Sequence, residues 1–81
     1  MQKSQGGTNI AGKRIAAARG LINPPITQEE LSGRLALQGI QLDRAAIAKI
    51  ESNRRRILDY ELRAFAVVLS VSAAWLLGDE R

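Results

Sequence analysis

The sequence predicts an all-α domain built from five short helices, and three observations support this fold class. No segment alternates apolar and polar residues in the way that a half-buried strand does. Three residues that favour helix N-caps, Thr27, Asp43 and Ser72, each stand before a stretch in which apolar residues have helical spacing. The segment 59–69 also places apolar side chains at i, i+3, i+4 and i+7, which indicates a helix with one buried face.

The first helix is expected from about Thr8 to Arg19, with Gly20 as a natural stop. Its core-facing side should consist of Ile10, Ala11, Ile15 and Ala18. The segment "LINPPI" then forms a loop, because Pro24 and Pro25 cannot continue a helix.

The second helix has the clearest start signal. Thr27 and Glu30 have the spacing of a capping box, in which each side chain bonds the backbone N–H of the other residue. Leu31 and Leu35 follow on one face, one turn apart. The helix should fade at residues 37–38, before Gly39.

Three further helices complete the fold. Asp43 is the expected N-cap of the third, and the fourth should run from about Asp59 to Leu69. The buried stripe of the fourth is expected to hold Leu62, Phe65, Ala66 and Leu69. Ser72 caps a short fifth helix, "AAWLL", which Gly78 ends.

These elements assign residues 8–81 to one domain. The chain has 81 residues, which is near the lower size limit for domains that fold without disulfides. Residues 1–7, "MQKSQGG", are polar and rich in glycine, and we expect them to form a disordered leader.

The composition argues against an enzyme. The chain has neither cysteine nor histidine, which removes thiolate chemistry, the common zinc sites and every catalytic arrangement that depends on histidine. Most of its eight acidic residues stand at helix starts or beside basic residues. We therefore expect no catalytic residues, no metal, no cofactor and no small-molecule ligand.

The sequence also gives an expectation of cellular location. Its longest apolar run, "AFAVVL", is far shorter than the ~20 residues that a membrane-spanning helix needs, and no export signal is recognisable. No helix joins a broad apolar face to a strongly basic one, as a membrane-surface helix would. We expect a cytoplasmic protein without a membrane partner.

Positive charge is concentrated in one part of the chain. Residues 1–56 hold ten lysines and arginines against four acidic residues, whereas residues 57–81 hold two against four. This asymmetry favours a polyanionic partner, nucleic acid first, over a randomly charged surface.

The third helix carries the most informative pattern, "LDRAAIAKIESNRRR". At ~100° per residue, Ile47 and Ile50 point together toward the core. The outward side is expected to hold Ala45, Ala48, Lys49 and Ser52, with Arg44 at its flank. Small side chains let a helix approach base edges in the major groove of DNA.

The arginines that follow this helix strengthen the interpretation. Arg54, Arg55 and Arg56 stand where a phosphate backbone would pass a helix in the groove, and Lys13 or Arg14 is expected to add to them from the first helix. The alternative is a surface helix in which alanine serves helix propensity alone. That alternative leaves the arginine cluster unexplained.

Glu51 lies only ~70° from the core direction and is expected to be half-buried. A half-buried carboxylate needs a partner. Arg19, near the end of the first helix, can supply it, so we predict an ion pair between Arg19 and Glu51 that ties the first helix to the third.

Five segments in this order resemble a known family. They read "GKRIAAAR", "TQEELS", "DRAAIAKIE", "ELRAFAVVL" and "VSAAWLLG", and they span about residues 9–78. The pattern is similar to the lambda-repressor-like, Cro/XRE-type (XRE family) helix-turn-helix regulators. This resemblance implies a lambda-repressor-like fold whose recognition helix, about residues 43–53, lies in the DNA major groove.

The resemblance also implies roles for individual residues. Gln28 falls where the family contacts a phosphate and supports the recognition helix. The positions that read or face bases are Arg44, Ala45, Ala48 and Lys49. The positions that hold phosphates after the helix are Ser52, Asn53 and Arg54. Arg19 and Glu51 match a structural pair of the family.

One departure from the family concerns the connector "LQGIQLD", which is about three residues longer than the usual turn of a helix-turn-helix. Ile40 and Leu42 are expected to pack into the core to compensate. The longer connector leaves open which of Gln41, Arg44 and Lys49 reaches a base.

The sequence therefore predicts sequence-specific binding of double-stranded DNA by a small transcriptional regulator, a repressor from a bacterium or one of its mobile elements. A homodimer on a two-fold operator is expected, with the Trp75–Leu77 region as the candidate contact, although Trp75 could instead fill the core. The alternative function is an antitoxin-type protein-interaction module whose DNA binding serves autoregulation.

Overall fold

Five α-helices form the regular structure of residues 8–79, the part of the chain that the computed structural model describes, and this part holds no strand. The expected leader, residues 1–7, lies outside it. The helices are α1 (Gly12–Leu21), α2 (Gln28–Leu37), α3 (Arg44–Glu51), α4 (Asp59–Leu69) and α5 (Ala73–Leu76). The predicted all-α class and the predicted order of five helices are confirmed.

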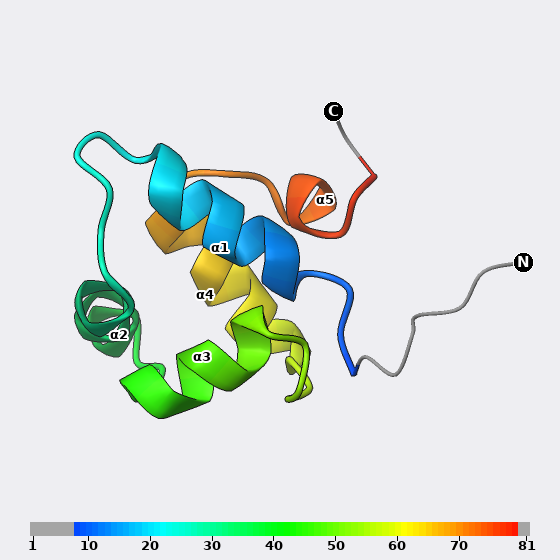
Figure 1. Cartoon of the computed structure of the whole chain (residues 1–81), viewed down its shortest axis with the longest axis horizontal. Helices are drawn as coiled ribbons and strands as arrows, with labels where there is room; N and C mark the ends of the chain where they lie inside the picture. Colours follow the sequence, from blue (N-terminus) through cyan, green and yellow to red (C-terminus); the bar gives the residue numbers. More distant parts are fainter. Residues whose placement is uncertain (1–7, 80–81) are drawn as a thin grey trace, which may run out of the picture.

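The helices pack around α1 and α4, which cross the middle of the molecule (Figure 1). The third helix packs against α1 and α2 and lies along one edge, whereas α5 packs against α1 and α4 on the opposite side (Figure 1). The fully buried side chains come from all five helices: Ile15, Leu31, Leu35, Ile47, Ile50, Phe65 and Leu76. One core therefore fixes the position of α3 relative to every other helix.

The predicted caps form as expected. Thr27 Oγ1 accepts a hydrogen bond from Glu30 N at 3.0 Å, and Glu30 Oε1 accepts one from Thr27 N at 2.8 Å, so the capping box is complete. Asp43 Oδ1 accepts from Ala46 N at 2.8 Å, and Ser72 Oγ accepts from Trp75 N at 2.9 Å. These bonds satisfy backbone donors that a helix start leaves without partners.

The first helix differs from its prediction at both ends. It begins at Gly12 rather than Thr8, because Asn9 Oδ1 accepts hydrogen bonds from Ala11 N and Gly12 N and holds this segment in a turn. Ile10 is consequently 66% exposed, so its predicted place in the core was wrong. The helix also continues through Gly20 to Leu21, because the backbone becomes extended only at Ile22.

The long connector between α2 and α3 packs as predicted. Leu42 is buried and Ile40 is partly buried against the core. Ser32 Oγ on α2 donates a hydrogen bond to the carbonyl oxygen of Leu42 at 2.7 Å. The extra residues are thus anchored to α2 just before α3 begins.

Within residues 8–79, every helix falls short of the length and apolarity that crossing a lipid bilayer requires.

Candidate nucleic-acid interface

The third helix faces as the sequence predicts. Ile47 and Ile50 are completely buried, whereas Ala45 and Lys49 are exposed. Ala48 departs from the expectation because it is half-buried. Its neighbours one turn away on the helix surface are Arg44 and Ser52, which leave its methyl group less accessible.

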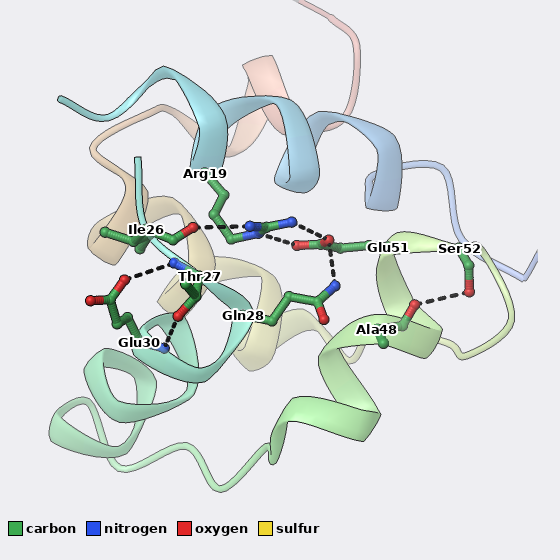
Figure 2. A network of polar contacts seen from close by, with 8 residues as sticks. All are labelled: Arg19, Ile26, Thr27, Gln28, Glu30, Ala48, Glu51 and Ser52. Carbon is green, nitrogen blue, oxygen red and sulfur yellow. Dashed lines mark hydrogen bonds and ion pairs between the residues drawn. The ribbon is translucent and has the colours of Figure 1, made fainter. Parts of the chain in front are cut away.

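A polar network braces α3 from within the protein (Figure 2). Arg19 Nε and Nη2 donate to the two carboxylate oxygens of Glu51, each at 2.9 Å, and the Glu51 side chain is only 7% exposed. Arg19 Nη1 donates to the carbonyl oxygen of Ile26, also at 2.9 Å. The predicted ion pair is therefore confirmed, and it joins α1, the loop before α2 and α3.

Gln28 belongs to the same network. Its Nε2 donates to Glu51 Oε1 at 2.9 Å, so the first residue of α2 supports the last residue of α3 (Figure 2). The hydrogen bonds to Glu51 raise the pKa of Arg19 above its ordinary value, because they favour the charged guanidinium. The Arg19 side of this brace therefore stays charged.

The end of α3 is closed by a second set of contacts. Ser52 Oγ donates to the carbonyl oxygen of Ala48 at 2.9 Å and accepts from Arg54 Nε at the same distance. Asn53 follows with φ of 67°, a left-handed conformation that asparagine tolerates better than most residues. The chain thereby turns away from α3 directly after its last turn.

Asn53 also fastens the N-terminal segment to this turn. Its Oδ1 accepts from Thr8 N at 3.1 Å and from Asn9 N at 2.8 Å, and Asn9 Nδ2 donates to the carbonyl oxygens of Ile50 and Arg55. The sequence analysis missed Asn9, although an asparagine just before a helix is an N-cap signal. The expected phosphate contact of Asn53 would have to involve its amide nitrogen, because the oxygen is already bonded.

The three arginines after α3 are not equivalent. Arg54 and Arg56 are exposed, whereas Arg55 is half-buried. Arg55 Nη1 lies 3.1 Å from Glu61 Oε1, and the same carboxylate oxygen accepts from Leu58 N at 2.9 Å. This role of Glu61 was not predicted from the sequence. Its position as the third residue of α4 indicates it, because a glutamate there can cap the helix.

Exposed cations accompany α3 along its length. Arg44 Nε lies 4.0 Å from Glu29 Oε1, but both side chains are more than two-thirds exposed, so this contact holds Arg44 only weakly. Gln41, on the connector before α3, is exposed as well. Arg44 and Gln41 are therefore accessible from solvent at the start of the helix.

Lys13 and Arg14 on α1 were expected to add phosphate contacts, but Arg14 contacts α5 instead. The Arg14 guanidinium lies 4.7 Å from the centroid of the Trp75 ring, and its Nη1 donates to the carbonyl oxygen of Trp75 at 3.2 Å. Lys13 is exposed beside a hollow of about 460 Å³ that Ser52 and Asn53 also line. Lys13 thus adjoins the end of α3, whereas Arg14 ties α1 to α5.

A second hollow, of about 320 Å³, lies next to the N-terminal segment. Its apolar lining consists of Ile10, Ala11, Ile57, Leu62 and Leu77. We call it the side groove. Trp75 is half-buried against the core, and Leu77 is at the rim of the side groove.

Comparison of the chain with protein-family models, with curated proteins and with solved structures gave no match in any of the three.

Proposed function

We propose that the protein binds double-stranded DNA sequence-specifically as a small transcriptional repressor, with α3 and its flanks, about residues 43–53, in the major groove. The observation that carries this proposal is the surface of α3, which combines buried isoleucines with a narrow, cationic outer side. The resemblance to lambda-repressor-like regulators supports the same function.

The dimensions of the helix and the groove agree. An α-helix with side chains is about 10–12 Å across, and the major groove is about 12 Å wide. Ala45 and Ala48 add little to the width of α3, so its backbone can come close to base edges. Arg44 at the first turn is long enough to bond O6 and N7 of a guanine with two N–H groups.

Charged side chains around the end of α3 suit a phosphate backbone. Lys13, Lys49, Arg54 and Arg56 are exposed, and three of them lie at or after the end of α3. Gln28 keeps one amide N–H beyond its bond to Glu51, and this N–H can donate to a phosphate. Arg55 is held by Glu61, so we assign it a structural role rather than a phosphate contact.

The Arg19–Glu51–Gln28 network holds α3, the proposed recognition helix, rigidly in place. Phosphate contacts fix the position of a protein on DNA, and base contacts require that the helix keep its angle while they form. The network bonds α3 to both α1 and α2 without using a side chain from the outer side of α3. The outer side is therefore left to the DNA.

We further propose that the repressor works as a homodimer whose contact is the side groove, which includes Leu77 of the Trp75–Leu77 region. The groove adjoins Thr8 and Asn9, which are bonded to Asn53 just after α3. A two-fold contact here brings the ends of two α3 helices near one axis, as half-sites about one helical turn apart require.

A gel-shift titration over a salt series tests DNA binding. Four cationic phosphate contacts per chain, from Lys13, Lys49, Arg54 and Arg56, predict a slope of roughly −3.6 per bound chain for the logarithm of the association constant against the logarithm of salt concentration. The affinity of each chain should therefore fall roughly 150-fold between 50 and 200 mM salt. The titration should use the DNA upstream of the protein's own coding sequence together with an unrelated duplex of the same length. A slope near zero would contradict the proposal.

Two arginine substitutions separate base reading from phosphate binding. Arg44→Ala should relax the preference at one base pair and cost ~1–3 kcal/mol on the preferred sequence alone. Arg56→Ala should weaken all sequences by a similar factor and reduce the salt slope by about 1. Selection from randomised duplexes followed by binding titrations measures both effects.

Arg63→Ala is the matched control, because Arg63 is an exposed arginine on α4, outside the proposed surface. Its binding should equal that of the unaltered protein. Indistinguishable behaviour of Arg44→Ala and Arg56→Ala would show that α3 does not read bases.

A further inference from the structure

The surface across α1 and α4 from the third helix has an unusual composition. Residues 20–28 and 64–78 contain no charged residue, although a quarter of the whole chain is charged. These two segments meet where α1 ends and where the chain leaves α4 for α5 (Figure 1). The two segments therefore bring no charged side chain of their own to this end of the molecule.

A hollow of about 300 Å³ opens at this end, which we call the back hollow. Its lining is apolar apart from one serine and consists of Ala18, Leu21, Ile22, Leu69, Ser70 and Val71. Leu21 at its rim is 75% exposed, and Ile22 and Val71 are only partly buried. An exposed leucine beside an apolar hollow is apolar surface that a contact with another protein would remove from water.

We propose that the back hollow binds a second copy of the same chain. In a two-fold contact the same patch lies on both sides, so it must supply both a projecting group and a space that receives it. The exposed side chain of Leu21 is the projecting group, and the apolar hollow beside it is the space. Insertion of Leu21 from each copy into the hollow of the other buries both.

The absence of charge removes the main obstacle to contact between two copies of this chain. Each chain has a formal net charge of +4, so two copies repel wherever their basic surfaces approach. In a two-fold contact, a charged residue near the axis faces its own copy and is repelled by it. The lining of the back hollow has no charged residue, so this repulsion does not arise. The contact also leaves the side groove and the α3 surface accessible.

The pairing has a consequence that rests on the proposed DNA binding. The third helix lies along the edge of the molecule opposite the end of α1 and the start of the link from α4 to α5, the segments that line the back hollow (Figure 1). Two copies joined back to back therefore present their α3 surfaces in opposite directions. Such a pair holds two separate duplex segments, whereas contact through the side groove serves two half-sites of one operator.

Sedimentation of the full chain over a range of concentrations tests the pairing without DNA. Leu21→Glu should weaken association roughly tenfold or more, because a leucine that the contact buries becomes a carboxylate. At concentrations where the unaltered protein is largely paired through the back hollow, the average mass of Leu21→Glu should be clearly lower, whether or not the side groove also pairs.

Leu37→Glu is the matched control. Leu37 is 86% exposed at the end of α2, so this variant makes the same chemical change away from the back hollow. Its mass should equal that of the unaltered protein, and circular dichroism should report both variants folded. An unchanged mass for Leu21→Glu would overturn the proposal and leave the surface to a different protein.

A single introduced cysteine gives an independent readout, because the chain has none of its own. Leu21→Cys should form a disulfide-linked dimer on mild oxidation, since residues near a two-fold axis meet their own copies. Leu37→Cys should form no disulfide-linked dimer under the same conditions. Equal cross-linking of both variants would overturn the proposal.

A duplex-bridging assay separates this inference from the proposed function. Beads that carry one duplex and the unaltered protein should retain a second, labelled duplex, and Leu21→Glu should release it while still binding the first. If no duplex binds but Leu21→Glu still lowers the average mass, the DNA-binding proposal fails and the pairing stands. If the duplex binds but the mass is unchanged, only the pairing fails.

Discussion

Replacing Arg19 with alanine is expected to lower the free energy of unfolding by about 3–5 kcal/mol, the largest effect of any single change considered for this protein. The substitution removes both hydrogen bonds from the guanidinium to Glu51, whose side chain is only 7% exposed. A carboxylate left in that position keeps only the bond from Gln28 and cannot recover its hydration. The free-energy cost of leaving the Glu51 carboxylate without its partner exceeds the net contribution of the hydrogen bonds themselves.

Urea denaturation followed by circular dichroism measures the effect. For a domain of this size, a loss of about 3 kcal/mol corresponds to a fall in melting temperature of roughly 12 °C or more. The matched control is Arg44→Ala, which removes the 4.0 Å contact with Glu29 between two exposed side chains. That change should cost less than ~1 kcal/mol. Equal losses for the two variants would show that the Arg19–Glu51 pair does not brace α3.

The second large effect concerns Gly12, where α1 comes closest to α3. A Cβ atom added at Gly12 would overlap the carbonyl oxygen of Ile50, which belongs to the backbone and cannot rotate away. Gly12→Ala must therefore separate the two helices, and overpacking of this kind costs about 1–3 kcal/mol or more. We expect a corresponding fall in the urea midpoint and, because α3 shifts, weaker binding to DNA.

Gly20→Ala is the control within the same helix. A Cβ at Gly20 meets no other atom within 4 Å, and alanine is the better helix former by about 0.5–1 kcal/mol. This substitution should leave stability unchanged or raise it. A stable Gly12→Ala variant would contradict the close approach of α1 to the end of α3.

Local signals in the sequence were sufficient for most of the fold. Thr27 with Glu30, and Asp43 with Ala46, interact over three residues, so the spacing of the letters alone places the caps. Ile47 and Ile50 fix the rotation of α3, and that rotation in turn places Glu51 near α1. The pairing with Arg19 could therefore be predicted without coordinates.

Contacts that depend on distant parts of the chain were not predictable in this way. Asn9 and Asn53 are 44 positions apart, and nothing near Asn9 announces that its backbone will bond a side chain beyond α3. The predicted helix start and the predicted burial of Ile10 failed because Asn9 Oδ1 also accepts from Ala11 N and Gly12 N, a local turn that was not predicted. Arg55 likewise differs from Arg54 and Arg56 through its ion pair with Glu61, which the run of three arginines does not indicate.

The bond between Thr8 and Asn53 bears on how the protein should be prepared. An affinity tag or fluorescent fusion joined ahead of Thr8 would emerge beside the last turn of α3 and crowd the groove-facing side chains. Attachment after Asp79 starts instead from the α5 side of the molecule, which leaves α3 accessible but needs a linker, because Leu77 at the rim of the side groove is two residues away.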